Sequence, residues 1–347
     1  MRLVVGLDVS LEQTAVCVLG RDGTVVWQGK VASEPGPLTD RLRTWRGEID
    51  LVGLEAAPLA DHLYRALVAD GFEAVCMETR HAQRFLSTRP VKTDKNDARG
   101  LAEMLRLGHF RPVHVKSAEM GEVRTALQAR RQVVDALVQM QAAIRGLLRA
   151  HGLKLGSVHR CNFEERVEAL LRVAPRLELA IQPLLRVVAQ LREERANFDR
   201  LLGQAARRDP VCLRLMTVPG VGPITSLCYR ATVDDPTRFR SSRAVGAHLG
   251  LTPRVYQSGE IDRHGAISKS GDRMMRHLLY EAASALLTRA SRKPSRLRAW
   301  GVALARRRGA RKARVAVARK LAVILHRIWV SGGRFETGVA VPRLAAA

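Results

Sequence analysis

The sequence predicts a mixed α/β domain in its first third, followed by two mostly helical regions. Three observations support this division. Short apolar runs alternate with helical patterns over the first hundred or so residues, which is typical of a sheet covered by helices. Two long amphipathic stretches follow, and the last third is very basic and contains glycine turns. A chain of 347 residues has room for two or three such domains.

The first domain is predicted from the order of its elements. Asp22 and Gly23 separate the second and third apolar runs, which is a strong hairpin-turn signal. Strands are predicted at 3–9, 14–19, 24–31, 49–54 and 73–77, and helices at 38–45, 59–69, 81–85 and 94–107. Three meander strands, then helix, strand, helix, strand and helix, is the order of the ribonuclease H-like fold. In that fold the ends of the first and fourth strands and the last helix converge at one edge of the sheet.

Four acidic residues occupy the converging positions. Asp8 lies in the first apolar run, Glu55 closes the fourth-strand run, and Asp94 and Asp97 are three apart on the last helix and share a face. Carboxylates at buried strand ends are costly unless compensated. Hard divalent cations prefer oxygen ligands, and two of them can clamp the oxygens of a phosphodiester. The acids therefore predict a magnesium or manganese site.

Each of these acids also has a simpler explanation. Asp8 alone would be a capping or turn residue. Asp94 and Asp97 alone would be a solvated first helical turn, where acids favour the helix dipole. The four together, in matching strand contexts, favour the metal site over coincidence.

The middle of the chain is predicted as two long helices. The first spans 117–153 with Ser117 as its cap, and the second spans 163–206, where Pro175 and Pro183 break or kink it. They form either a hairpin within one chain or a coiled coil between two chains, and the imperfect heptad pattern leaves both open. The predicted domains are therefore 1–115, 116–208 and 209–347.

The last region combines glycine turns with basic residues. Gly220 and Gly222 precede a helix at 224–231 and resemble a helix-hairpin-helix element, whose backbone N–H groups bind phosphate; a simple tight turn is the alternative. A glycine- and serine-rich loop at 249–259 leads to a helix at 274–288 and a very basic last helix. Phosphate contacts are expected from Lys269, Arg273, Arg307, Arg311 and Lys312.

Composition points to a polyanionic partner. The chain has 58 Lys and Arg against 33 Asp and Glu, a net charge of +25, and nucleic acid is the usual partner for such an excess. A basic protein without a specific ligand is the alternative. The five cysteines show no C-x-x-C pair and are expected to be reduced and mostly buried. With neither a signal peptide nor a membrane span expected, the protein is predicted to be soluble and cytoplasmic.

Nearly the whole chain resembles the DEDD-type insertion-sequence transposases of the one-hundred-and-ten family, also called bridge-RNA-guided recombinases. The most specific blocks are K-T-D-x-x-D-A at 92–98 and the later S-G…I-S-K-x-G-D. Further matching blocks lie at 6–10, 55–56, 218–223, 249–253 and 318–321. On composition alone Ser258 is a loop serine like any other, and no Ser-His-Asp spacing is visible.

The resemblance supplies what the residues alone do not. It implies an N-terminal domain similar to the Holliday-junction resolvase RuvC, whose acids Asp8, Glu55, Asp94 and Asp97 bind magnesium. It implies a mostly helical C-terminal domain whose serine, here Ser258, bonds covalently to a DNA end. It also implies active-site halves that meet across subunits, a dimer that assembles to a tetramer, and a structured noncoding RNA that pairs with donor and target DNA. Many relatives carry a second glycine where this chain has Glu260, which leaves the shape of that loop open.

Other functions account for fewer of these features. Sugar kinases and actin-like ATPases also begin with glycine, an apolar residue and aspartate, but this chain lacks their second phosphate-wrapping glycine after Asp8. A Holliday-junction-type endonuclease explains the acids but not a serine domain. A non-catalytic nucleic-acid-binding scaffold explains the charge but not four acids in register.

Overall fold

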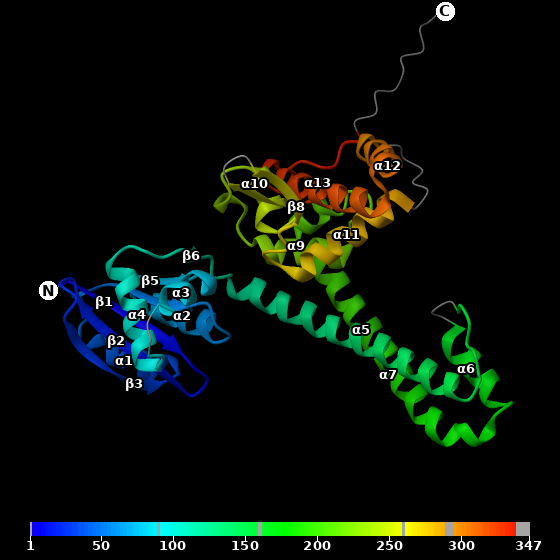
Figure 1. Ribbon diagram of the computed structural model, residues 1–347, viewed down its shortest axis with the longest axis horizontal. Coiled ribbons are helices and arrows are strands. Elements are labelled where there is room, and N and C mark those ends of the chain that lie inside the picture. Colours follow the sequence, from blue (N-terminus) through cyan, green and yellow to red (C-terminus); the bar gives the residue numbers. More distant parts are fainter. Residues whose placement is uncertain (1, 89–90, 159–161, 259–260, 289–294, 338–347) are drawn as a thin grey trace, which may run out of the picture. The chain divides into compact units, whose positions relative to one another are not determined.

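The computed structural model describes residues 2–88, 91–158, 162–258, 261–288 and 295–337. The chain divides into two compact units, Met1–Lys116 and Ser117–Ala347. The predicted middle and last regions both belong to the second unit (Figure 1). Over the described residues, none of the helices combines the length and the apolar character that crossing a membrane requires.

The first unit is built on a six-stranded mixed sheet in the order β3-β2-β1-β4-β5-β6. β2 is antiparallel to β1 and β3, β4 is parallel to β1, and β5 is parallel to β4. The strands are β1 (Leu3–Val9), β2 (Gln13–Gly20), β3 (Val25–Ala32), β4 (Ile49–Glu55), β5 (Ala74–Met77) and β6 (Pro112–Val113). The ribonuclease H-like order predicted for the first five strands is confirmed; the two-residue β6 was not predicted.

Helices cover both faces of this sheet. They are α1 (Pro35–Arg43), α2 (Ala60–Ala69), α3 (Thr79–Leu86) and α4 (Asp94–Arg106). Leu3, Val5 and Leu7 of β1 belong to a core shared with α1 and α2. Because side chains alternate along a strand, Val4, Gly6 and Asp8 point to the opposite face, where Val4 shares a second core with α4.

Two glycines let α4 lie close to the sheet. Gly6 of β1 and Gly53 of β4 are register partners, so together they leave a flat patch without side chains. A Cβ atom at Gly6 would collide with the backbone of Ala98 and Ala102, and one at Gly53 would lie 2.6 Å from the Leu105 side chain. This close approach fixes the start of α4 beside the carboxyl ends of β1 and β4.

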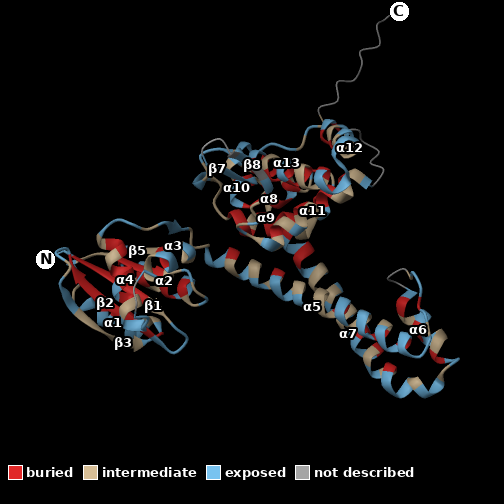
Figure 2. Cartoon of the chain, viewed as in Figure 1, coloured by how far each residue is buried: buried red, intermediate tan, exposed pale blue. Residues whose placement is uncertain are grey.

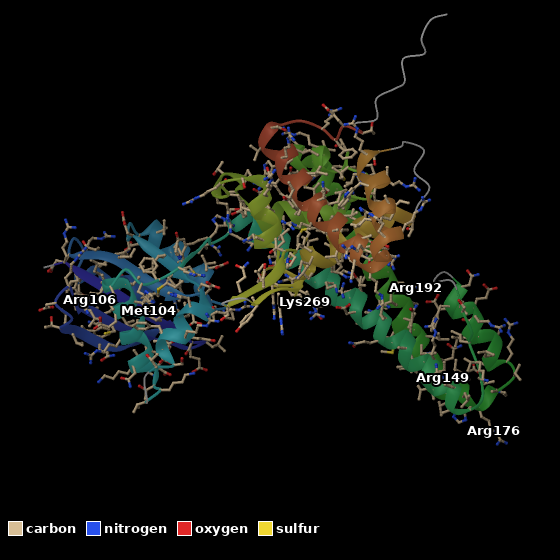
Figure 3. All side chains as sticks on the ribbon, turned by 45° about the horizontal axis from the view of Figure 1, so that its top comes forward. Met104, Arg106, Arg149, Arg176, Arg192 and Lys269 are labelled. Atoms are coloured by element: carbon tan, nitrogen blue, oxygen red, sulfur yellow. The ribbon has the colours of Figure 1, made fainter. Side chains whose placement is uncertain are left out.

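The second unit begins with a helical hairpin. α5 (Ala118–Ala150) packs against α7 (Glu178–Arg208), with α6 (Phe163–Leu171) and η2 (Pro175–Leu177) between them in sequence. Apolar residues of α5, α6 and α7, among them Ile144, Val167 and Val188, form one buried core, so the intrachain hairpin is the arrangement the structure shows. Figure 3 labels three arginines of this hairpin, Arg149, Arg176 and Arg192, and Arg192 forms an ion pair with Glu164 of α6.

Pro175 and Pro183 were predicted to break or kink the second helix, and a break is found near Pro175 but not at Pro183. The chain is interrupted near Pro175, which begins η2, but Pro183 lies inside α7 without ending it. Pro183 is in the second turn of α7, so only the hydrogen bond to the carbonyl of Leu179 is lost.

The rest of the second unit is a helical body that carries one exposed hairpin of strands. Its helices are α8 (Pro210–Leu215), α9 (Pro223–Val233), η3 (Pro236–Arg238), α10 (Ser242–His248), α11 (Arg273–Thr288), α12 (Arg296–Arg308) and α13 (Ala310–Ser331). The segment expected to be a loop contains β7 (Pro253–Ser258), which pairs with β8 (Ile261–Ile267). Figure 2 shows the buried residues gathered among the helices and β7 exposed along its length.

The cysteine prediction holds for the described residues. Cys17, Cys76, Cys212 and Cys228 are buried and form no disulfide within the described residues, and Cys161 lies outside those residues. Burial raises the pKa of the Cys76 thiol to about 11 and that of Cys228 to about 12. These thiols are therefore protonated and unreactive at neutral pH.

Candidate active site

The ends of two central strands place the first pair of acids. Leu7 of β1 pairs with Leu54 of β4, and Asp8 and Glu55 follow them directly. Asp8 and Glu55 share a sheet face with Gly6 and Gly53, two residues earlier on each strand. Both side chains are half-buried. The sheet register therefore brings together two carboxylates that are 47 positions apart in the sequence.

The first turn of α4 supplies the second pair. The Thr93 hydroxyl accepts a hydrogen bond from the Asn96 backbone N–H at 3.2 Å and caps the helix. Asp94 and Asp97 follow in that turn. Ala98, directly after Asp97, is the residue whose carbonyl approaches Gly6. We call Asp8, Glu55, Asp94 and Asp97 the acid edge.

The electrostatics show that Asp8 and Glu55 are affected by burial and by the neighbouring acids. Burial raises the pKa of Asp8, and the charges of Asp97 and Asp94 raise it further. Burial also raises the pKa of Glu55, followed by the charge of Asp8, while a hydrogen bond from Thr79 lowers it. Burial and like charges both disfavour the ionised form. The acid edge is thus a site of concentrated negative charge in the folded unit.

Two lysines counter that charge. Lys30 Nζ on β3 donates a hydrogen bond to Asp94 Oδ2 at 2.6 Å, and this bond lowers the pKa of Asp94. Lys92 lowers the pKa of Asp8 and of Glu55 by its charge. Gln28 Nε2, also on β3, donates to the Lys95 carbonyl at 2.6 Å. Side chains of the edge strand β3 therefore contact both the beginning of α4 and one of its acids.

The acid edge fits a hard divalent cation by its chemistry. It offers only carboxylate oxygens, and a cation placed among them would offset the repulsion that raises the pKa of Asp8. Among the described residues, no group of three or more His, Cys, Asp or Glu side chains is already arranged to hold a metal ion. Asp94 is instead paired with Lys30 in an ion pair that is about half exposed.

Ser258 occupies a very different setting in the second unit. It is the last residue of β7, pairs in register with Ile261, and is exposed. We call β7 and β8 the serine ribbon. Val255 and Tyr256 of this ribbon are 54% and 63% exposed. Gly259 and Glu260, including the departure noted at Glu260, lie outside the described residues. Over the described part of the chain, no residue hydrogen-bonds to the Ser258 hydroxyl.

The base of the ribbon is firmly built by two interlocked turns. Gly250 (φ 65°) and Gly271 (φ 78°) are both in the left-handed region. A Cβ atom at Gly250 would collide with the backbone of Ser270, and one at Gly271 would collide with the carbonyl of His248. Arg276 donates to the Ser270 carbonyl at 2.7 Å. The L-G-L-T-P and I-S-K-S-G-D motifs therefore anchor the ribbon at its base.

The expected phosphate-binding residues lie on several separate elements. Gly220 (φ 88°) lies in the turn between α8 and α9, and Gly222 is the N-cap of α9. A Cβ atom at Gly220 would collide with the carbonyl of Ala282 on α11, so this glycine has a packing role whatever it binds. Lys269, Arg273, Arg307, Arg311 and Lys312 are all exposed, on the ribbon base, α11, α12 and α13. The phosphate roles of these residues stay predictions.

Some of the residues around the acid edge were not predicted. Lys30, Thr79 and Gln28 all contact the acids or the start of α4. Each lies on an edge strand or at a helix start, where a single polar residue carries no periodic signal. The repeated order glycine, leucine, acid at 6–8 and 53–55 is the sequence signal that could have identified the glycine patch.

Comparison with known proteins identifies the family. A family model described as "Transposase IS116/IS110/IS902 family" matches residues 212–299, and a DEDD transposase model matches residues 5–152. The transposase for insertion sequence element IS1111A of Coxiella burnetii is 30% identical over 96% of this chain and 90% of its own length. A probable family 20 transposase of Pseudomonas aeruginosa is 32% identical over 79% of this chain and 82% of its own.

Solved structures are also similar over part of the chain. The Thermus thermophilus RuvC structure is 15% identical, with a TM-score of 0.25, over 32% of this chain and 99% of its own. The family assignment depends on the sequence relatives, of which the Coxiella burnetii transposase spans 96% of this chain. On their evidence, the chain belongs to the IS116/IS110/IS902 family of transposases.

Proposed function

We propose that this protein cuts and rejoins DNA strands at the ends of an insertion element, with the acid edge and Ser258 acting on the same phosphodiester. The observation that supports the proposal is geometric: the pairing of β1 with β4 places Asp8 beside Glu55, and the close contact of α4 with Gly6 brings the first turn of α4 toward the same edge. Family membership supports DNA as the substrate. The net charge of +25 supports a polyanionic partner.

The chemistry is transesterification through a phosphoserine. The Ser258 Oγ attacks phosphorus, an Oγ–P bond forms, and the bond from phosphorus to the leaving 3′-oxygen or its equivalent breaks. Serine loses a proton and the leaving oxygen gains one. After strand exchange, the hydroxyl of the new strand attacks the phosphoserine and the proton returns to Ser258. Each step exchanges one phosphoester for another, so no nucleotide hydrolysis is needed.

The acids prepare the phosphodiester for that attack. Asp8, Glu55, Asp94 and Asp97 would hold one or two Mg²⁺ or Mn²⁺ ions, which when bound stabilise negative charge on the phosphate oxygens. Asp8 and Glu55 are positioned by rigid central strands, so their separation is set by the sheet register. Asp94 is exposed and paired with Lys30, and it is the acid that can move.

The central experiment separates the two halves of this chemistry. Full-length protein is incubated with Mg²⁺ and DNA that carries the element ends, together with RNA from the element's flanking noncoding segment, and reactions are stopped in denaturant. Asp8→Asn is expected to abolish strand cleavage and to retain DNA binding. Ser258→Ala is expected to abolish the covalent protein–DNA adduct.

Ser241→Ala is the matched control for the serine. Ser241 is an exposed N-cap residue of α10 whose side chain makes no cap hydrogen bond, so this variant is expected to form the adduct normally. Normal recombination by Ser258→Ala together with an inactive Asp8→Asn would overturn the serine mechanism. Water or a DNA hydroxyl would then be the nucleophile, as in a junction-resolving endonuclease. Normal cleavage by Asp8→Asn would overturn the role of the acid edge.

Mixing the two variants tests the expected assembly. We propose that the acid edge and Ser258 that act on one phosphodiester come from different subunits of a homo-oligomer. Asp8→Asn and Ser258→Ala proteins are each expected to be inactive alone and to regain part of the activity when mixed. If the mixture stays inactive while sedimentation shows mixed oligomers, both halves come from one subunit.

A structured noncoding RNA is proposed as the guide that pairs with donor and target DNA. This part of the proposal comes from the family resemblance and is supported by the basic surface of the second unit. RNA transcribed from the flanking segment is expected to bind more tightly than a shuffled RNA of equal length at the same salt concentration. Recombination should follow base changes made in the RNA and the DNA together. Recombination that proceeds equally without the RNA would contradict this role.

A further inference from the structure

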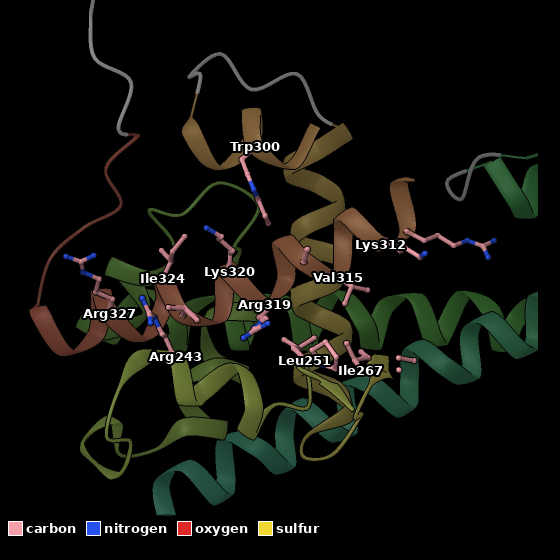
Figure 4. Close-up of a pocket in the computed structure, with 16 residues that line it drawn as sticks. Arg243, Leu251, Ile267, Trp300, Lys312, Val315, Arg319, Lys320, Ile324 and Arg327 are labelled. Carbon is pink, nitrogen blue, oxygen red and sulfur yellow. The ribbon is translucent and has the colours of Figure 1, made fainter. Parts of the chain in front are cut away.

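A large groove lies along α13 in the second unit and has no assigned role. Its volume is about 920 Å³. One wall comes from Trp300 of α12, and the other from Leu251 and Ile267 at the base of the serine ribbon. Six cationic side chains surround it: Arg243, Arg311, Lys312, Arg319, Lys320 and Arg327. We call this the α13 groove (Figure 4).

Cations and apolar residues alternate along the floor of the groove. Arg311, Arg319 and Arg327 are eight residues apart, with Val315 and Val323 midway between them. These five residues recur every four positions and so form one ridge, which winds gradually around the helix. At 1.5 Å per residue, successive arginines on this ridge are about 12 Å apart. A neighbouring ridge repeats the pattern with two lysines, an alanine and an isoleucine.

Packing holds these charged side chains at the groove. The side-chain stem of Arg319 runs across α10, where a Cβ atom at Gly246 would meet its Cγ at 3.3 Å. The Lys320 ammonium lies 4.8 Å from the centroid of the Trp300 ring. An aromatic face of this kind attracts a cation and can equally stack against a nucleobase.

The charge of the groove selects a polyanion. None of the described residues that line it is acidic, and six of the sixteen are Lys or Arg. An apolar floor between the cations is poorly matched to a closed duplex, which presents phosphates and keeps its bases stacked inside. It matches a strand with unpaired bases, because phosphates can meet the cations while bases contact the apolar residues.

We propose that the α13 groove binds single-stranded DNA, the unpaired strand present between cutting and rejoining. This inference rests on the proposed function. The groove wall includes Ile267 at the base of the ribbon that carries Ser258. Six strand residues, Pro253–Ser258, span about 17 Å, so a strand linked to Ser258 reaches the groove within that length. This proximity favours DNA over RNA as the occupant.

The test measures binding of a fluorescent 12-nucleotide single-stranded DNA to the full-length protein by anisotropy, over a range of salt concentrations. Trp300→Ala is expected to lower affinity about tenfold with an unchanged salt slope, because it removes a stacking surface and no charge. Arg319→Gln with Lys320→Gln is expected to lower affinity and to reduce the salt slope by about 1.4, for two lost phosphate contacts. Duplex DNA of the same sequence should bind more weakly to wild type and be insensitive to Trp300→Ala.

Matched variants guard against trivial effects. Arg306→Gln with Arg308→Gln removes the same charge from exposed positions of α12 that do not line the groove, and should have a smaller effect on affinity and slope. Trp300→Phe keeps an aromatic face and should bind nearly as wild type. If Trp300→Ala fails to fold, Val323→Gln at the half-buried floor serves in its place and should weaken binding without changing the slope.

Several results would overturn this assignment. One is single-strand affinity unchanged by both Trp300→Ala and Val323→Gln. Another is an RNA of the same sequence that binds more tightly than the DNA and whose binding is abolished by these two variants. That result would assign the groove to RNA. A third is altered self-association of these variants with normal DNA affinity, which would assign the groove to a second copy of the chain. Asp8→Asn changes the acid edge and leaves the groove intact, so it should bind this DNA as wild type does. A failure of the proposed cleavage chemistry can therefore be distinguished from a failure of the proposed groove.

Discussion

The acid edge and the serine ribbon carry the two halves of the proposed chemistry in opposite physical settings. Asp8 and Glu55 lie half-buried at the ends of central strands, and burial raises the pKa of both, with a further increase from neighbouring acids. Ser258 ends an exposed two-stranded ribbon whose strands pair with each other. An isolated two-stranded hairpin is marginally stable in water, even with an anchored base. In the proposed function the acid edge is completed by a cation, whereas the ribbon is completed by a macromolecular surface.

The largest expected effect tests how rigidly the sheet places the acids. Gly6→Ala puts a Cβ atom into the backbone of Ala98 and Ala102, so α4 must move away from β1. We expect a loss of about 3 kcal/mol or more in the stability of the first unit. Gly36→Ala is the control, since its Cβ would meet no atom within 4 Å. Labelling of the buried Cys17 thiol during urea unfolding reports on this unit.

The same change should disable the chemistry. Moving α4 separates Asp94 and Asp97 from the strand-end acids, so cleavage should fall even in the protein that remains folded. A Gly6→Ala protein with normal stability and normal cleavage would show that the close contact between helix and sheet does not position the site.

The second effect concerns the electrostatic cost of the acid edge. Because the pKa of Asp8 is raised, the folded state holds the proton more tightly than the unfolded state does. Stability therefore falls as pH rises from the ordinary value of 3.8 through the raised pKa, and the full cost is present at neutral pH. Asp8→Asn should stabilise the metal-free first unit by about 1 kcal/mol at pH 7. The difference should vanish below about pH 3.8, where both proteins are uncharged at this position.

Tryptophan fluorescence can follow this unit alone. Trp27 and Trp45 lie in the first unit with ring centroids 6.0 Å apart, and replacing Trp300 and Trp329 by Phe removes the signal of the second unit. Saturating Mg²⁺ should reverse the order of stability, because wild type gains binding energy that the variant lacks. An Asp8→Asn protein that is less stable at pH 7 in chelator would show that the carboxylate contributes to folding instead of opposing it.

A smaller effect is expected at the ion pair that holds Asp94. Lys30 Nζ and Asp94 are both about half exposed, so the pair opens easily when a divalent cation competes for the carboxylate. Lys30→Met should raise Mn²⁺ affinity up to about fivefold by calorimetry. Lys95→Met is the control: it removes an equal charge from the helix turn that carries Asp94 and should change Mn²⁺ affinity less. Weaker Mn²⁺ binding by Lys30→Met would mean that the ammonium helps to organise the acids.

The sequence predicted the structure well wherever burial of one face makes apolar residues recur at regular spacing. The apolar run that contains Asp8, the run that closes at Glu55 and the helix that begins at Asp94 were visible because a buried strand or helix face repeats its apolar residues. The serine ribbon was missed because both of its faces are exposed, so Arg254 to Ser258 shows no alternation. Lys30 was missed because its contact with Asp94 spans 64 positions on an exposed edge strand. Ser258 was selected by family resemblance, since its exposed setting has no local signature of a nucleophile.

The smallest expected change in stability comes from a substitution on the serine ribbon. It tests most directly whether the ribbon is placed differently from the acid edge. Tyr256 is 63% exposed, so Tyr256→Ser should alter the stability of the second unit by no more than about 0.5 kcal/mol. If the ribbon is placed by DNA, the same change should reduce the yield of covalent adduct about tenfold, since strands of a ribbon can enter a DNA groove and contact base edges. Val330→Ser alters a side chain that is 61% exposed near the end of α13 and should leave both quantities unchanged. A Tyr256→Ser protein that forms adduct at the normal rate would show that the ribbon is positioned from its interlocked base alone, as rigidly as the strands position Asp8.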